Sequence, residues 1–241
     1  VAHGPRLQFF EIELRRSLMP VCFTFDIEEH HRIEAAAAAG YKCPLETQSE
    51  YARRMESCTR WLLEKLAEHN ARSTFFIVGL IATTHPNLVR DIADAGHEIA
   101  CHSWDHQRVH RLSPDEFRLD VRRAKIELEQ ASGKPVVGYR APTFSITRET
   151  AWAIDVLAEE GMRYDSSVFP VHHDRYGIPQ APRVPFLATG MQRSLLEFPP
   201  VTYAVLGKNL PAAGGGYFRL YPPAIIRAGI RQILRDPLGL P

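Results

Sequence analysis

The sequence predicts an α/β fold in which strands and helices alternate along the chain. Three observations support it: short apolar runs alternate with amphipathic segments, the runs end in polar residues, and the connections are short. Repeated βα units of this kind give parallel strands with right-handed crossovers, in either an α/β barrel or a doubly wound sheet. Because 241 residues with 45% hydrophobic side chains suffice for one large core, we start from a single domain.

The strands are predicted from short apolar and β-branched runs. The first run, residues 21–25, breaks into the charged sequence DIEEHH, as a buried strand does where it reaches the surface. The other strands are expected at residues 73–78, 97–101, 136–139, 162–164 and 195–198. Residues 171–194 and 199–216 are rich in Pro and Gly and are expected to form surface loops of the kind that shape a substrate cleft.

The helices are predicted from apolar side chains at helical spacing. Residues 48–69 carry one apolar face and are otherwise charged, which is typical of an amphipathic helix. Ser113 and Glu116 form a capping box, with Pro114 at the first helical position, and so predict the start of another helix. The apolar stripe of that helix is Phe117, Val121, Ala124, Leu128 and Ala131. The remaining helices are expected at residues 86–95 and 147–160.

Charge and cysteine content argue against several functional classes. The 29 Lys and Arg residues nearly balance the 28 Asp and Glu residues, so nothing favours nucleic acid or an anionic membrane as a partner. The cysteines, Cys22, Cys43, Cys58 and Cys101, show no CxxC spacing, which fits a reducing compartment. No stretch reaches the roughly 18 apolar residues that predict a transmembrane helix. Without a signal-peptide pattern, we expect a cytoplasmic protein.

Polar residues follow successive predicted strands. Asp26 and Glu28 follow the first strand, His102 the third, Arg140 the fourth and Asp165 the fifth. In parallel α/β folds the carboxyl ends of the strands form the functional face. The sequence therefore predicts that these side chains gather at one edge.

A divalent metal site is predicted at that edge. His102 and His106 are four residues apart, a spacing that on a helical turn places both imidazoles on one face. Glu28 would complete three protein ligands and leave a position for water, as in zinc hydrolases. Taken alone, each motif also fits a solvated histidine pair or an acidic turn. Their occurrence at one end of neighbouring strands favours the metal site, with Zn²⁺ as the expected ion.

Four segments, FTFDIEEH, GHEIACHSWDH, GYRAPTFSI and YDSSVFP, resemble the successive motifs of the polysaccharide deacetylase (NodB homology) family, in order. The resemblance implies a distorted (β/α) barrel over residues 20–241, incomplete at its C-terminal end, after an N-terminal extension at residues 1–19. The Asp-Ile-Glu sequence and GGGYFRL at residues 214–220 are similar to deacetylases found with bacterial exopolysaccharide and exosortase loci. The implied activity is metal-dependent removal of N-acetyl groups from an amino-sugar polysaccharide, in exopolysaccharide biosynthesis.

The resemblance also implies roles for single residues. Asp26 would be the general base, and His102 and His106 would be metal ligands. Most of the family takes the third ligand from the residue after the base, but Ile27 cannot bind a metal. Some members take the third ligand from the residue two positions after the base, so we assign Glu28 as the third metal ligand.

Further roles follow from the later motifs. Arg140 would pair with Asp26 and keep it ionised, although an arginine there also fits a surface βα loop. Asp165, Ser166 and Pro142 are assigned to substrate binding, although Asp165-Ser166 also suits the start of a turn.

The last family motif, a leucine-rich strand ending in the general-acid histidine, has no match before Pro241. Either a continuation of the chain supplies that histidine or another group replaces it. His172 and His173 lie in a predicted loop and resemble surface histidines. Two other functions stay open at this point: hydrolysis of a small cyclic amide or imide, and carbohydrate binding without catalysis.

Overall fold

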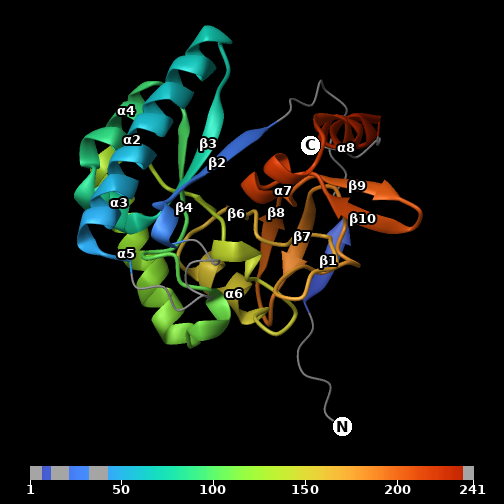
Figure 1. Cartoon of the computed structure of the whole chain (residues 1–241). Coiled ribbons are helices and arrows are strands. Elements are labelled where there is room, and N and C mark those ends of the chain that lie inside the picture. Colours follow the sequence, from blue (N-terminus) through green and yellow to red (C-terminus); the bar gives the residue numbers. More distant parts are fainter. Residues whose placement is uncertain (1–6, 12–21, 33–42, 236–241) are drawn as a thin grey trace. The chain divides into compact units, whose positions relative to one another are not determined.

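The computed structural model describes residues 7–11, 22–32 and 43–235 (Figure 1). The chain divides into two compact units. The first, which we call the βα unit, consists of Phe23–Gln107 and Arg118–Thr143. The second, which we call the hairpin unit, consists of Val1–Cys22, Arg108–Phe117 and Phe144–Pro241.

The βα unit is built on parallel strands. Their order is β2-β3-β4-β5. They are β2 (Phe23–Ile27), β3 (Ser73–Ile77), β4 (Glu98–Cys101) and β5 (Gly138–Tyr139). This confirms the predicted α/β class with parallel strands. The row is open within the described residues, so it forms no closed barrel there.

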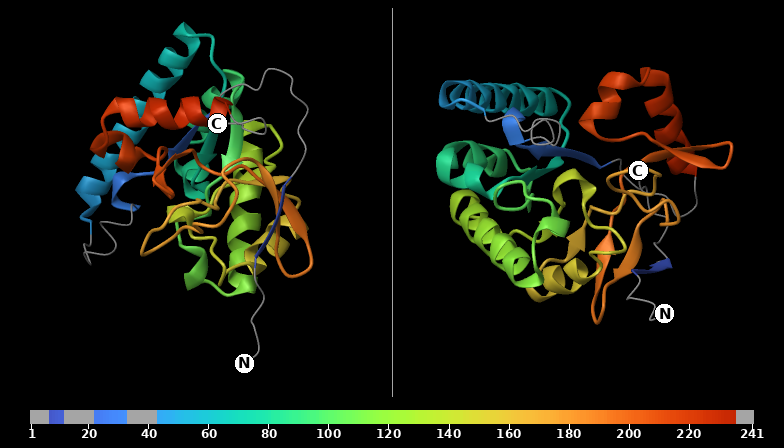
Figure 2. Two further views of the ribbon diagram at one scale, coloured as in Figure 1. Left: turned by 90° about the vertical axis from the view of Figure 1, so that its right-hand side faces the viewer. Right: turned by 60° about the horizontal axis from the view of Figure 1, so that its bottom comes forward.

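Helices cover these strands. In Figures 1 and 2 they lie on one side of the strands. They are α2 (Leu45–Glu68), α3 (Gly79–Thr84), α4 (Pro86–Asp94) and α5 (Pro114–Ser132). The capping box ahead of α5 is confirmed, since Ser113 N donates to Glu116 Oε2 at 2.8 Å and Glu116 N donates to Ser113 Oγ at 3.3 Å. Helix α3 was not predicted, because six residues are too few to show a helical period.

The core of the βα unit lies around its central strand. Phe75, Phe76 and Ile77 of β3 are all buried, and β3 pairs with a parallel strand on each side. Strand β2 pairs only with β3 among the described strands of this unit, and its Phe23 is exposed. The continuous apolar sequence of β3 therefore reflects its central position.

The hairpin unit combines antiparallel strands with short helices. Strand β1 (Gln8–Glu11) pairs with β7 (Phe186–Thr189), and β7 pairs with β8 (Ser194–Glu197), both antiparallel. Strand β8 runs parallel to β6 (Tyr164–Asp165). The other elements are the hairpin β9 (Thr202–Val205) and β10 (Lys208–Pro211), with α6 (Trp152–Glu159), α7 (Gly215–Leu220) and α8 (Pro223–Arg235). Figure 2 shows α8 beside β9. Gln232 of α8 makes hydrogen bonds with the backbone N–H and carbonyl groups of Ala204 in β9.

The expectation that residues 171–194 and 199–216 are loops was partly wrong, because β7, β9 and β10 lie there. The turn between β7 and β8 is held from outside the segment. Asp155 of α6 accepts hydrogen bonds from the backbone N–H groups of Met191, Gln192 and Arg193, at 2.6–2.9 Å. Local sequence could not reveal the β7–β8 turn, because a distant carboxylate satisfies its backbone N–H groups.

Several boundaries also differ from the sequence prediction. The first strand of the βα unit covers Phe23–Ile27, so Asp26 lies within it, whereas Val21 is outside the described residues. The helix expected at residues 147–160 is the shorter α6. Among the described residues, none of the helices combines the length and apolar character that crossing a membrane requires.

Candidate functional site

The parallel pairing of the βα unit continues past the strand ends. Val78 N donates to Ile27 O at 3.2 Å, and His102 N donates to Ile77 O at 3.0 Å. Arg140 N then donates to Cys101 O at 2.9 Å. The residues that follow the strands are therefore held in register along one edge, as the strand-end argument predicted.

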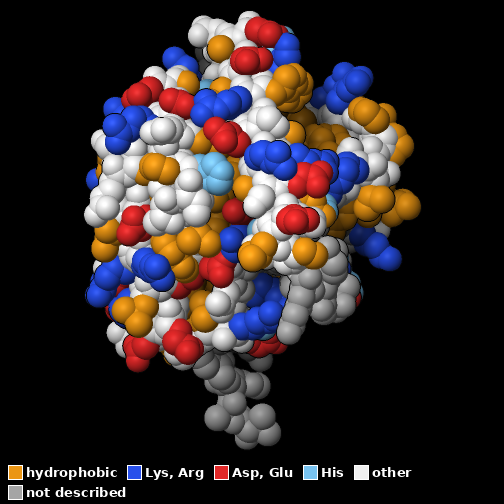
Figure 3. Space-filling view, turned by 60° about the vertical axis from the view of Figure 1, so that its left-hand side comes forward, with side chains coloured by type: hydrophobic (Ala, Val, Ile, Leu, Met, Phe, Trp, Pro, Cys, Tyr) orange, Lys and Arg blue, Asp and Glu red, His pale blue; other side chains and the backbone are white. Residues whose placement is uncertain are grey.

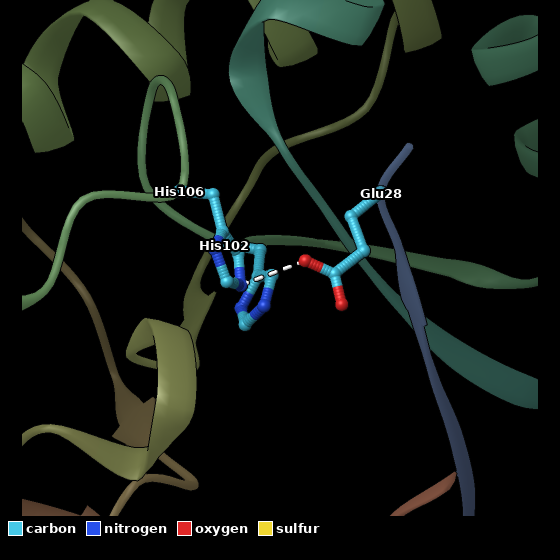
Figure 4. Close-up of side chains that lie close together, drawn as sticks. All are labelled: Glu28, His102 and His106. Atoms are coloured by element: carbon cyan, nitrogen blue, oxygen red, sulfur yellow. Dashed lines mark ion pairs between the residues drawn. The ribbon is translucent and has the colours of Figure 1, made fainter. Parts of the chain in front are cut away.

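Three of the predicted residues meet at this edge. One ligand atom from each of Glu28, His102 and His106 lies within 4.8 Å of the others (Figure 4). His106 Nε2 is 2.7 Å from Glu28 Oε2, and the two imidazole rings are 5.1 Å apart between centroids. His102 is only 2% exposed, while the side chains of His106 and Glu28 are 7% and 22% exposed. The cluster is thus largely shielded from solvent, and Glu28 is the most exposed of the three side chains.

His102 is oriented by a backbone contact. Its Nδ1 lies 2.7 Å from the carbonyl oxygen of Arg140. Because a carbonyl oxygen only accepts, Nδ1 carries the proton and the Nε2 lone pair is left for a ligand. Burial is the largest influence on the His102 pKa and lowers it, which favours the neutral ring that metal binding requires.

The cluster fits a divalent metal ion. Glu28 Oε2 is buried and makes no hydrogen bond to any described residue, although His106 Nε2 is close to it. That approach lacks hydrogen-bond geometry, so the two atoms are near each other without satisfying each other. Two imidazole nitrogens and one carboxylate oxygen form a donor set that suits Zn²⁺ and related transition metals.

The two histidines are not presented by a helical turn, so that part of the sequence argument was wrong. Residues 103–105 form a tight turn, and Ser103 and His106 have positive φ angles of 63° and 56°. Such angles are uncommon for residues other than glycine. The four-residue spacing still brings the imidazoles together, but through a constrained loop.

Asp26 and Arg140 form an ion pair in the same unit. Arg140 Nη1 donates to Asp26 Oδ1 at 2.8 Å and lies 3.0 Å from Thr24 Oγ1. The guanidinium also stacks over the ring of Phe76 at 4.0 Å. The Arg140 side chain is 8% exposed, whereas that of Asp26 is 31% exposed and can reach solvent.

This pairing sets the ionisation of Asp26. Burial is the largest single influence and raises the pKa of Asp26, but the charges of Arg140 and His102 and the hydrogen bond from Arg140 together outweigh it. The net effect is a lowered pKa, so the carboxylate is ionised at neutral pH. An ionised, solvent-reachable carboxylate can accept a proton.

The residues assigned to substrate binding are placed differently. Asp165 and Ser166 belong to the hairpin unit and are buried. Asp165 Oδ1 accepts a hydrogen bond from Ser167 Oγ at 2.5 Å, and Ser166 Oγ donates to Phe198 O at 2.7 Å. Pro142 is in the βα unit, where it is buried at the start of the short helix η3 (Pro142–Phe144). Their part in substrate binding stays a prediction.

The two loop histidines also lie in the hairpin unit. His172 is exposed, as the sequence suggested. His173 stacks on Tyr176 with 3.9 Å between ring centroids, and its Nδ1 is 2.9 Å from Asp174 Oδ1. Neither contact assigns them to catalysis.

Two residues near the cluster were missed. Arg32 Nε donates to Glu29 Oε2 at 2.6 Å and Arg32 also pairs with Asp105, which links the segments that carry Glu28 and His106. No local signal marks Arg32. Asp120 accepts a hydrogen bond from Trp104 N at 3.0 Å, and its signal was a carboxylate on the apolar side of its helix.

The surface chemistry adds a negative observation. On the face in Figure 3, acidic and basic side chains are interspersed rather than gathered by sign. This agrees with the formal net charge of +1.

Comparisons with known proteins bear on two stretches of the chain. Residues 48–164 match the family described as "Polysaccharide deacetylase", and residues 166–238 match a domain of unknown function, DUF3473. The first stretch includes His102, His106 and Arg140 and begins after Asp26 and Glu28.

Similar proteins carry related names. A peptidoglycan-N-acetylglucosamine deacetylase of Bacillus cereus is 27% identical over 117 residues, 44% of this chain and 42% of that protein. A chitooligosaccharide deacetylase of Rhizobium leguminosarum bv. trifolii is 30% identical over 115 residues, 48% of this chain and 49% of that protein. The chain thus spans less than half the length of these two relatives.

A solved structure supports the fold over a longer stretch. It is a crystal structure of a Mycobacterium smegmatis protein assigned as a polysaccharide deacetylase, with a TM-score of 0.58 and 30% sequence identity. The match covers 81% of this chain and 65% of that one. Residues 48–164 therefore form a stretch that matches the polysaccharide deacetylase family, and the chain is similar to that family over this stretch.

Proposed function

We propose that this chain removes N-acetyl groups from an amino-sugar polysaccharide, using a divalent metal held by Glu28, His102 and His106. The observation that carries the proposal is the meeting of these three ligand atoms within 4.8 Å in the unit that also holds the Asp26–Arg140 ion pair. The names of the relatives, deacetylases of peptidoglycan and of chitooligosaccharides, support the substrate class.

The residues have separate tasks in the proposed reaction. When bound, a divalent cation acts as a Lewis acid toward the acetyl carbonyl oxygen and toward water. Asp26 accepts the proton of the water molecule that attacks the carbonyl carbon. Arg140 keeps Asp26 ionised and holds its carboxylate in place. The amide C–N bond then breaks as its nitrogen takes up a proton from solvent water, and acetate and a free amine leave.

Three finer assignments belong to the same proposal. Zn²⁺ is the proposed ion, because two imidazoles and a carboxylate match its preferred donors. The proposed setting is exopolysaccharide biosynthesis, on the similarity of the Asp-Ile-Glu sequence and of residues 214–220. A cytoplasmic location is proposed because the four cysteines show no CxxC spacing, and cell fractionation would test it.

Acetate release is the decisive measurement. The purified chain is incubated with N-acetylated chitooligosaccharides, peptidoglycan fragments, an N-acetylated exopolysaccharide and a cyclic imide, with and without a chelator. We expect acetate from at least one glycan, loss of activity with the chelator and recovery with Zn²⁺. His102→Ala should abolish both metal binding and turnover, whereas His69→Ala, at an exposed position, should change neither.

The alternatives give distinct results. Glycan binding without acetate release would identify a carbohydrate-binding protein, and turnover of the imide alone would identify a cyclic amide hydrolase. Full metal content in a folded His102→Ala variant would contradict the ligand assignment.

A further inference from the structure

The turn that joins the two histidine ligands is constrained. Ser103 and His106 both have positive φ angles, which are disfavoured for side chains other than glycine. Residues in this conformation persist only where surrounding contacts hold them. The relative position of the His102 and His106 rings therefore depends on what holds the turn.

Backbone contacts hold it from one side. Gly79 N donates to Ser103 O at 2.8 Å, and Leu80 N donates to Trp104 O at 3.0 Å. A side chain at position 79 would be blocked, since an added Cβ lies 2.7 Å from Ala124 and 2.9 Å from Trp104. Helix α3 thus approaches the turn as closely as its backbone allows.

Helix α5 holds the turn through side chains. Trp104 N donates to Asp120 Oδ1 at 3.0 Å, and the guanidinium of Arg123 lies 3.7 Å from the centre of the Trp104 ring. Asp120 precedes Ala124 by one helical turn, and Ala124 is fully buried, so this carboxylate lies on the inward side of the helix. We call Asp120 and Arg123 the Trp104 clamp.

We infer that the Trp104 clamp positions the metal ligands, and that Asp120 is its principal positioning residue. Trp104 lies midway between His102 and His106, so a contact that fixes its backbone fixes the distance between the imidazoles. Outer contacts of this kind hold ligands in the geometry that the metal requires, and their loss typically lowers metal affinity about 10- to 100-fold. The inference rests on the proposed metal site.

Metal affinity tests it without relying on turnover. Zn²⁺ is titrated into the full chain against a chromogenic chelator, and Co²⁺ is added separately to record the visible spectrum, which reports ligand geometry. We expect Asp120→Ala to weaken Zn²⁺ binding about 10- to 100-fold and to shift the Co²⁺ spectrum. Asp120→Asn should recover most of the affinity, because its amide oxygen can still accept the Trp104 N–H.

A matched variant separates positioning from stability. Glu116→Ala removes a capping contact from the same helix, so it should lower the midpoint of urea unfolding and leave Zn²⁺ affinity and the Co²⁺ spectrum unchanged. If Asp120→Ala does not fold, Arg123→Ala replaces it, with reduced affinity again expected.

The outcomes are distinguishable. Wild-type protein that binds no Zn²⁺ would overturn the proposed function. Wild-type binding together with unchanged affinity and spectrum in a folded clamp variant would overturn only the positioning role. Equal losses in Asp120→Ala and Glu116→Ala would likewise overturn it, because they would show a general effect of stability.

Discussion

Replacing Asp26 with Asn separates proton transfer from metal binding. The amide keeps the size of the side chain and an oxygen that can accept the 2.8 Å hydrogen bond from Arg140, but it loses the negative charge. Since Asp26 is not among the three clustered ligand residues, we expect metal content close to that of the wild type.

The expected effects on rate and stability differ in size. Loss of a general base typically lowers turnover about 10²- to 10⁴-fold, which is about 2.7–5.4 kcal/mol at about 1.36 kcal/mol per tenfold change. The stability cost should be smaller, about 1–2 kcal/mol, because Arg140 keeps a hydrogen bond and Asp26 is 31% exposed to solvent.

The assay compares acetate release, metal content and urea unfolding in three proteins. Thr24→Val serves as the control, because it removes the 3.0 Å contact of Arg140 with Thr24 Oγ1 and leaves Asp26 in place. We expect it to lose about 1 kcal/mol of stability with a rate within about tenfold of wild type. An Asp26→Asn variant that retains more than a tenth of the wild-type rate would refute the role of Asp26 as base.

Three further predictions concern the βα unit. Burial raises the pKa of Asp120 from 3.8 to about 7, so its stabilising contribution is lost as pH rises from the unfolded to the folded value. Urea unfolding should therefore show Asp120→Asn gaining stability over wild type from about pH 4 to about pH 7, and a constant difference would contradict this. Burial also raises the pKa of Cys101, so we expect no alkylation in the folded protein under conditions that label exposed Cys58, as read by mass spectrometry. Gly79→Ala should destabilise by about 1–3 kcal/mol by thermal unfolding, because the new Cβ meets backbone atoms at 2.7 Å, whereas Gly216→Ala, with open space, should not.

The sequence located the site because its signals are local. A buried parallel strand is continuously apolar and ends in polar residues, so Glu28, His102 and Arg140 could be assigned to strand ends. The parallel register then brings those ends together, as the backbone bonds of His102 and Arg140 confirm. The spacing of His102 and His106 correctly predicted that their imidazole rings lie close together, although the turn between them is not helical.

Other features depend on residues far apart in the chain. The β7–β8 turn is completed by Asp155, so a Gly-containing stretch that reads as loop forms strands instead. The sequence places Asp120 on the apolar side of its helix, but only the packing of α5 against the turn shows that it binds Trp104 N.

The sequence by itself determined the α/β class, the residues at the ends of the parallel strands and the candidate ligands. Each of these depends on a short pattern of apolar and polar residues. Only the tertiary structure decided how the ligands are held. Arg140 reaches an aspartate 114 positions earlier, and Asp120 holds a turn 16 positions before it. It also placed Asp165 in a different compact unit from the histidines. Such contacts arise when packed elements bring distant side chains within hydrogen-bond range, and no local pattern encodes them.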